Sequence, residues 1–246
     1  MKYDLKKITF IIPFYLDHDD RIENARCVLS FLYKKFRTNI IFVESMEKRE
    51  LPPFSTSIYD ALYMVEKQDG DIFHRTKVIN AGIRKARTPF IAIYDTDCIF
   101  EPMQIVKAYQ LLEQGCDVAY PYDGRFMDID REYITTGEIK EHTSFATGSV
   151  GGAVFMNREK YIEAGLENEF LVSHAPEDAE RYHRLLTLGY RIARIEGKCY
   201  HITHWRGINS GAANPHHAQN MKEYEKVKAM NAEELQQYIN TWEWAK

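Results

Sequence analysis

Two aspartates separated by one residue, Asp95 and Asp97, carry the clearest chemistry in this chain. They close the apolar run 90–94, which predicts a buried parallel strand, so both carboxylates should emerge at the carboxyl end of a sheet, where open α/β folds bind ligands. Two carboxylates supply part of an oxygen-rich coordination sphere for a divalent cation and leave positions for diphosphate oxygens. Roughly one such pair per chain of this length is expected by chance, so the surrounding sequence must show whether this pair is a functional motif.

Three further groups of residues lie downstream. Glu177 and Asp178 open a predicted helix over 176–189, where acidic residues also simply complement the helix dipole. His201 and His204 end an apolar stretch. On a continuous strand, residues three apart face opposite sides, so both could reach one metal only if the backbone turns between them. Glycines at 148–152 lead into another apolar strand, where they indicate a bulge, a close packing contact or a ligand approach.

The elements that must position these residues follow from hydrophobic periodicity. Strands over 8–14 and 39–44 flank a helix over 20–36, which is a βαβ beginning with parallel strands. A helix over 73–86 should turn Val78, Ile79 and Ile83 inward and place its basic residues near the Asp-x-Asp strand. The chain then predicts a helix over 102–114 and strands over 117–122 and 191–195. The polar segment 123–147 is long for a structureless loop, which indicates an edge hairpin or a lid. Residues 58–67 fit a short helix or an irregular strand, and 220–244 are helical, with a start signal at 231–234.

Composition narrows the function classes. With 246 residues, 45% of them hydrophobic, the chain can bury one α/β core. A net charge of -4 argues against a broad nucleic-acid-binding face. The four cysteines lack paired metal-knuckle spacing, which favours reduced thiols and a cytoplasmic location. No apolar run approaches the roughly 20 residues of a membrane span, and a strand near Met1 leaves no expected room for a signal peptide. Peripheral membrane association through a partner stays open.

The order of the motifs is more specific than any single one. The chain reads Ile11-Ile12-Pro13-Phe14, Phe73-x-Arg75-x-Lys77-x-x-Asn80-x-Gly82, Asp95-x-Asp97, Gly151-Gly152, Glu177-Asp178 and then a His-containing strand end. This order resembles the GT-A glycosyltransferases, and among them the β-1,4-galactosyltransferase and chondroitin-polymerase type, over roughly residues 8–207. The resemblance implies an α/β fold with a mostly parallel central sheet flanked by helices. The expected GT-A domain covers 1–215, with a nucleotide half at about 1–100 and an acceptor half at about 101–215, followed by a helical extension over 216–246.

The resemblance also implies a ligand set. In that family the Asp-x-Asp and a downstream His hold Mn²⁺ (or Mg²⁺) on a UDP-sugar. Asp97 corresponds to the direct ligand and Asp95 lies nearer the ribose or the metal. His204 occupies the family's metal-His position, and His201 stands where some animal relatives carry a Met ligand, so a second imidazole is expected.

Roles for the remaining site residues come from the same resemblance. Pro13, Phe14 and Glu44 stand where the family holds the uridine. Arg75 and Lys77 stand where it grips nucleotide and sugar, and Gly151 with Gly152 joins the donor-binding set. Asp178 corresponds to the general base and Glu177 to an acceptor-positioning residue. Two departures concern specificity: residues 171–175 replace a Trp-Gly-rich acceptor segment, and Ser149 replaces a bulky aromatic, which gives room for an N-acetylated donor sugar.

These residues suit the transfer of a sugar from a UDP-sugar to a hydroxyl group. Displacing UDP from an anomeric carbon develops negative charge on the diphosphate, which a cation stabilises, while a carboxylate on the opposite face takes the acceptor's proton. The helix dipole would keep Asp178 ionised, as a base must be. Single displacement inverts the anomeric centre. We therefore predict an inverting, metal-dependent transfer of a hexose or N-acetylhexosamine (Gal/GalNAc-like) from a UDP-sugar to a glycan or glycolipid acceptor, in polysaccharide biosynthesis.

Two alternatives remain at this stage. A nucleotide-sugar or glycan binding module of the same fold would lack turnover, and the presence of Asp178 favours the enzyme. A sugar nucleotidyltransferase should carry a Gly-rich, basic phosphate loop directly after its first strand, whereas this chain has Pro13-Phe14-Tyr15-Leu16-Asp17 there.

Overall fold

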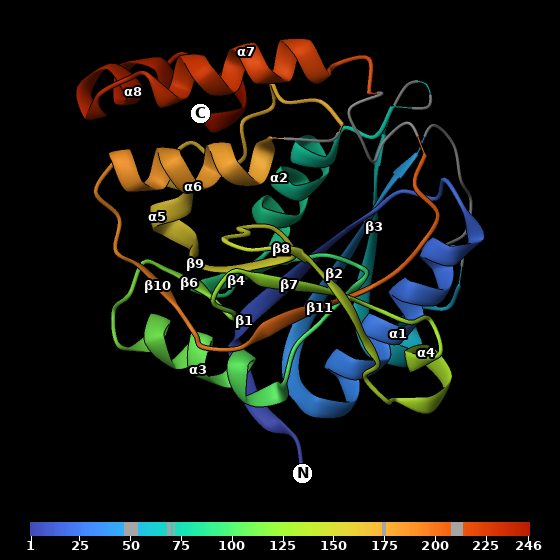
Figure 1. Ribbon diagram of the computed structural model, residues 1–246. Helices are drawn as coiled ribbons and strands as arrows, with labels where there is room; N and C mark the ends of the chain where they lie inside the picture. Colours follow the sequence, from blue (N-terminus) through green and yellow to red (C-terminus); the bar gives the residue numbers. More distant parts are fainter. Residues whose placement is uncertain (47–53, 68–69, 71, 174–175, 208–213) are drawn as a thin grey trace.

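A seven-stranded sheet forms the centre of the computed structural model, which describes residues 1–46, 54–67, 70, 72–173, 176–207 and 214–246. The strand order is β10-β6-β9-β4-β1-β2-β3, and all neighbours run parallel except β9, which is antiparallel to β4 and β6. The strands are β1 (Tyr3–Phe14), β2 (Phe36–Met46), β3 (Ala61–Lys67), β4 (Phe90–Tyr94), β6 (Val118–Tyr120), β9 (Ala153–Asn157) and β10 (Ile192–Arg194). The expected mostly parallel α/β sheet is confirmed (Figure 1).

Helices cover both faces of this sheet, which is why its middle strands are continuous apolar runs. α1 (Asp19–Lys35) joins β1 to β2, as the βαβ pattern predicts. α2 (Arg75–Lys85) packs against β1 and β2 with Val78, Ile79 and Ile83 buried, while α3 (Pro102–Glu113) lies on the opposite side (Figure 1). Residues 58–67 resolve into a 3₁₀ turn, η1 (Ser57–Tyr59), and the edge strand β3.

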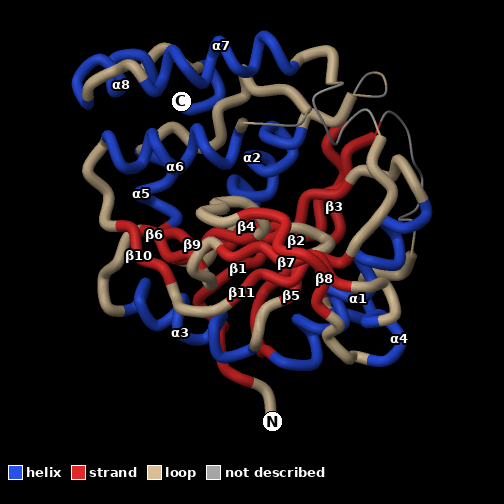
Figure 2. The backbone as a smooth tube through the Cα atoms, in the orientation of Figure 1, coloured by secondary structure: helices blue, strands red, loops and turns tan. Residues whose placement is uncertain are grey.

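A smaller four-stranded sheet is connected to the large one by the short segment between β4 and β5 (Cys98–Ile99), which contains Asp95 and Asp97. Its order is β5-β11-β7-β8, from β5 (Cys98–Ile99), β11 (Lys198–Ile202), β7 (Arg125–Ile129) and β8 (Glu141–Ala146), with α4 (Tyr133–Thr136) between the last two (Figure 2). The long polar segment therefore contains an antiparallel hairpin, one of the two expected forms. Pairing of Cys98 with His201 brings the chain after Asp97 beside the histidine-bearing strand.

Four helices build the remaining layer. α5 (Arg158–Glu163) is capped by the Asn157 side chain, which accepts a hydrogen bond from the Lys160 amide. α6 (Glu177–Thr187) carries the acidic pair in its first turn. α7 (His217–Lys228) and α8 (Ala232–Ile239), with the 3₁₀ turn η3 (Glu243–Ala245), lie over α6 (Figure 1). The helices that the structure describes are all too short or too polar to span a membrane.

Candidate functional site

One cavity of about 590 Å³ gathers most of the predicted site residues at the carboxyl ends of β1 and β4. It is lined by motif residues from six separate stretches of the chain: Pro13, Arg75, Asp95, Asp97, Gly151, Gly152, Glu177, Asp178, His201 and His204. Parallel strands deliver their following loops to one edge, which is why aspartates after β4 meet residues after β1. The described lining thus combines carboxylates, imidazoles and a guanidinium in one space.

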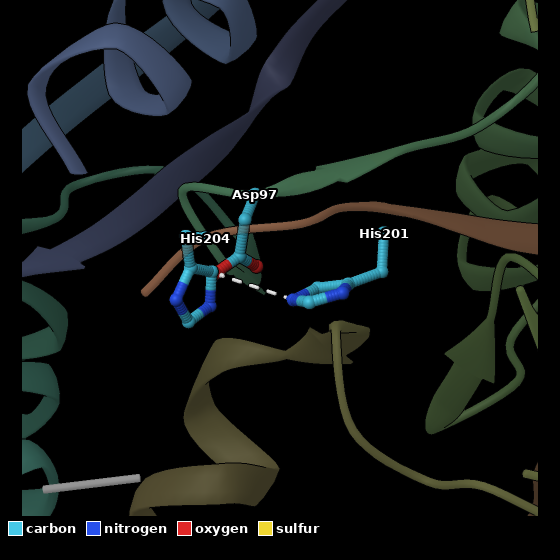
Figure 3. A group of neighbouring side chains, drawn as sticks. All are labelled: Asp97, His201 and His204. Atoms are coloured by element: carbon cyan, nitrogen blue, oxygen red, sulfur yellow. Dashed lines mark ion pairs between the residues drawn. The ribbon is translucent and has the colours of Figure 1, made fainter. Parts of the chain in front are cut away.

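Asp97, His201 and His204 form the tightest group in the cavity. The Nε2 atom of His204 lies 3.2 Å and that of His201 3.7 Å from Asp97 Oδ2. β11 ends at Ile202, so the backbone leaves the strand between the two histidines and both rings turn toward one carboxylate (Figure 3). The geometric condition set by their spacing is therefore met, and the three side chains could hold one metal ion.

Hydrogen bonds on the far side of each ring fix which nitrogen faces Asp97. His201 Nδ1 lies 2.7 Å from Asp128 Oδ1, and His204 Nδ1 lies 2.6 Å from the Trp205 carbonyl oxygen. Because those partners accept, each Nδ1 carries a proton, and in the neutral form of each ring Nε2 can offer its lone pair to a cation. One carboxylate with two imidazoles suits Mn²⁺ better than Mg²⁺, which prefers an all-oxygen shell. The residues present therefore fit the ion that the resemblance implies.

The charges within this group stabilise one another. Burial disfavours the Asp97 anion, but contacts with His201 and then His204 outweigh burial and hold the pKa of Asp97 well below its usual value. Burial likewise lowers the pKa of His201, whereas Asp97 and Asp128 raise it more strongly, to about 9. The site is thus poised to hold a positive charge beside Asp97.

Arg75 contacts both acidic motifs of the cavity. Its guanidinium contacts Asp95 at 2.5 Å, Glu177 at 3.5 Å and Asp178 at 3.6 Å. Burial raises the pKa of Asp95, and Arg75 counteracts this only in part. Burial, then the neighbouring Asp178 charge, raise the pKa of Glu177 to about 7, against the opposing effect of Arg75. Glu177 therefore exchanges a proton near neutral pH.

Asp178 is held by a buried arginine that the sequence motifs did not single out. Arg181, one helical turn later and 1% exposed, donates to Asp178 Oδ1 at 2.5 Å and to Glu167 Oε1 at 2.9 Å. Tyr161 donates to that same Glu167 oxygen at 2.5 Å. On the other side of the carboxylate, a Cβ added to Gly151 would lie 2.8 Å from Asp178 Oδ2, so only glycine leaves this approach open.

Three predicted donor-binding residues lie outside the described cavity lining. Phe14 is buried against Phe42, with ring centroids 5.0 Å apart, because strand alternation turns it away from the side of Pro13. Glu44 is fully buried and accepts a hydrogen bond from the Tyr63 hydroxyl at 2.7 Å. Lys77 lies 3.5 Å from Glu66 on the surface of α2. Their roles in donor binding stay predictions from the resemblance.

The structure describes Ser149 and part of the segment 171–175, the two places where the sequence differs from the family pattern. Ser149 lines the cavity, and its Oγ accepts a hydrogen bond from the buried Tyr122 hydroxyl at 3.0 Å. Of the segment 171–175, Ser173 also lines the cavity, whereas residues 174 and 175 lie outside the described residues.

A mostly parallel sheet has carboxylates at its strand ends, and a helix-borne acidic pair lies across the same cavity. This arrangement is that of a GT-A-type domain. Residues 10–165 match the family described as glycosyl transferase family 2. The chain therefore belongs to glycosyl transferase family 2.

A solved structure supports this fold. The catalytic domain of Drosophila β1,4-galactosyltransferase 7 in complex with xylobiose matches with a TM-score of 0.50 at 16% identity, covering 78% of this chain and 64% of that one. A mutant of the same enzyme in complex with manganese, UDP-Gal and xylobiose matches with a TM-score of 0.49 at 15% identity and the same coverage. The chain thus spans about 64% of the length of these structures. No curated protein matches it in sequence.

Proposed function

We propose that this chain is an inverting, metal-dependent glycosyltransferase that moves a hexose or N-acetylhexosamine from a UDP-sugar to a glycan acceptor. The observation that carries the proposal is the shared cavity: the Asp97–His201–His204 group and the Asp178 carboxylate line the same space. One group suits a cation on the leaving diphosphate, and the other suits a base for the incoming hydroxyl.

On the donor side, Asp97, His201 and His204 would hold a divalent cation such as Mn²⁺. A bound cation of this kind acts as a Lewis acid toward a leaving diphosphate. Asp128 and the Trp205 carbonyl keep the two rings oriented for this task. Arg75 neutralises Asp95 at 2.5 Å, which limits the negative charge that a diphosphate would meet on entering the cavity.

On the acceptor side, Asp178 would take the proton of the attacking hydroxyl. Its place in the first turn of α6 and its ion pair with Arg181 favour the ionised form that a base requires. A single displacement with this carboxylate opposite the leaving group inverts the anomeric carbon. Glu177, whose pKa lies at about 7, would orient the acceptor hydroxyl as donor or acceptor of a hydrogen bond.

The side chain at position 149 bears on the size of the donor sugar. Ser149 offers a small side chain at the cavity wall, and Tyr122 holds its hydroxyl in place. This supports space for an N-acetyl group and hence a GalNAc-like donor as well as Gal. A binding module without turnover is not favoured, because the positioned base would have no purpose there.

Calorimetry of UDP binding with and without Mn²⁺ tests the proposal, on the native chain and on Asp97→Ala. Asp130→Ala serves as the matched control, because Asp130 pairs with His142 outside the cavity. We expect tight UDP binding to require both Mn²⁺ and Asp97 and to survive in the control. An equal UDP affinity with and without Mn²⁺ would overturn the proposed metal dependence. NMR of the anomeric proton in the product then decides between inversion and retention.

A further inference from the structure

A side chain of α1 already contacts the proposed metal ligands. Arg21 Nη1 lies 3.2 Å from Asp97 Oδ2 and 3.0 Å from His204 Nε2. These are the same two atoms that approach each other to 3.2 Å and that would bind a cation. Arg21 is separated from them by 76 and 183 residues in sequence, and its side chain is only 16% exposed.

The contact with His204 is incompatible with metal binding to the same nitrogen. Nδ1 of this ring donates to the Trp205 carbonyl, so Nε2 holds the ring's one available lone pair. That lone pair lies in the ring plane and serves either an N–H donor or a metal ion. Arg21 must therefore leave His204 before a cation can bind there.

A second anchor lets the guanidinium leave without losing every partner. Arg21 Nε lies 3.1 Å from Asp17 Oδ1, four residues earlier, and both residues line the cavity. Rotation about this anchor moves Nη1 off Asp97 and His204 while the ion pair with Asp17 persists. The released nitrogen stays inside the same cavity, where planar guanidinium groups recognise phosphate oxygens well.

We propose that Arg21 competes with the divalent cation for Asp97 and His204, and that it binds the donor's diphosphate once it is displaced. This inference rests on the metal site of the proposed function. It implies cooperativity, because a divalent cation and a guanidinium side by side repel each other unless an anion lies between them. Mn²⁺ alone should bind weakly, and UDP should strengthen its binding by giving Arg21 a new partner.

Removing Arg21 should change two affinities in opposite directions. In Arg21→Ala and Arg21→Gln, Mn²⁺ alone should bind about tenfold tighter, since no charge-assisted hydrogen bond has to be broken first. UDP in saturating Mn²⁺ should bind about tenfold more weakly, because one phosphate contact is lost. Titration calorimetry with Mn²⁺ alone, and then with UDP at saturating Mn²⁺, measures both, and circular dichroism verifies the fold of each variant.

Arg26→Ala is the matched control, since Arg26 is an exposed residue of the same helix outside the cavity. It removes the same formal charge and should leave both affinities unchanged. Repeating the Mn²⁺ titration at about 0.5 M salt screens long-range charge effects, so a gain from lost competition should persist there.

The outcomes separate this inference from the function on which it rests. If Mn²⁺ binds the native chain and requires Asp97, but neither Arg21 variant tightens it, the competition is refuted and the metal site stands. A gain in Mn²⁺ affinity that high salt abolishes, or that Arg26→Ala reproduces, also refutes it. Absence of Mn²⁺ binding in the native chain and in both variants overturns the metal site and this inference together.

Discussion

The proposed donor side of the cavity is assembled at strand ends, whereas the proposed acceptor side is carried by the first turn of one helix. Asp97 and His201 meet because β5 pairs with β11 in a defined register. Asp178, by contrast, is held from within the protein by Arg181 and Glu167, both 1% exposed. Backbone pairing positions the proposed metal ligands, and buried charge positions the proposed base.

The two halves should therefore respond differently to single substitutions. A strand register is shared by many residues, so one substitution rarely shifts it. A buried ion pair depends on two side chains, and loss of either leaves an uncompensated charge. Arg75 contacts carboxylates of both halves, Asp95 and Asp178.

The largest expected effect separates chemistry from donor binding. Asp178→Asn should lower the transfer rate by about a thousandfold, the scale of losing a general base. Mn²⁺-dependent UDP binding should stay within about twofold of the native value, because the metal ligands are untouched. Rapid-quench transfer assays and calorimetry measure the two quantities. A parallel loss of UDP affinity would show that the two halves are not separable.

Next in size is the cost of breaking the buried ion pair. Arg181→Met should lower the free energy of unfolding by about 3 kcal/mol, since Glu167 then lies buried without its counter-charge. Lys140→Met, which breaks an exposed pair with Glu132, should cost less than about 1 kcal/mol. Urea denaturation at neutral pH compares them. Equal costs would refute the claim that buried charge supports the base.

A smaller effect concerns pH. The pKa of Glu177 is raised from 4.5 to about 7, so between these values the native state keeps a proton that the unfolded chain has released. Stability from this group is therefore present at low pH and is lost as pH rises toward 7. Glu177→Gln should flatten the decline in unfolding free energy between about pH 5 and pH 8 by roughly 1 kcal/mol or more. Parallel pH profiles of native and variant, measured by urea denaturation, would contradict this.

The smallest effect tests the resemblance against the structure. Lys77 pairs with Glu66 outside the described cavity lining, so Lys77→Ala should change UDP affinity by less than about twofold. Arg75→Ala, two residues earlier on the same helix, should weaken it far more. Calorimetric titration of both variants decides, and a large loss in Lys77→Ala would restore the role that the motif implies.

Much of the fold could be predicted because its signals are local. The apolar run before Asp95 and the βαβ beginning depend on neighbours in sequence. The segment 123–147 predicts either a hairpin or a lid, since both kinds of segment share the same polar composition. Phe14 shows the limit of motif matching: it belongs to the family motif, but the alternation of β1 turns it into the core.

Local sequence patterns do not reveal which residues contact the predicted site residues. Arg21 reads as one more charge on an exposed helix face, and nothing near it indicates contacts with residues 76 and 183 positions away. Asp128 reads as part of a polar loop, and Arg181 as a surface charge of α6. The contacts of Arg21 with Asp97 and of Asp128 with His201 join residues far apart in sequence. The pair between Arg181 and Asp178 lies within α6, but the burial of Arg181 against Glu167 depends on how the helical layer packs.

The C-terminal helices that lie over α6 limit which segments can be exchanged between related enzymes. Trp242 is fully buried, lies 5.3 Å from the Arg184 guanidinium of α6, and would clash with any Cβ at Gly165. A hybrid enzyme joined at residue 215 would replace this tryptophan and uncover the back of the helix that carries Asp178. Exchange of acceptor specificity by recombination should therefore keep 158–187 and 217–245 from the same parent.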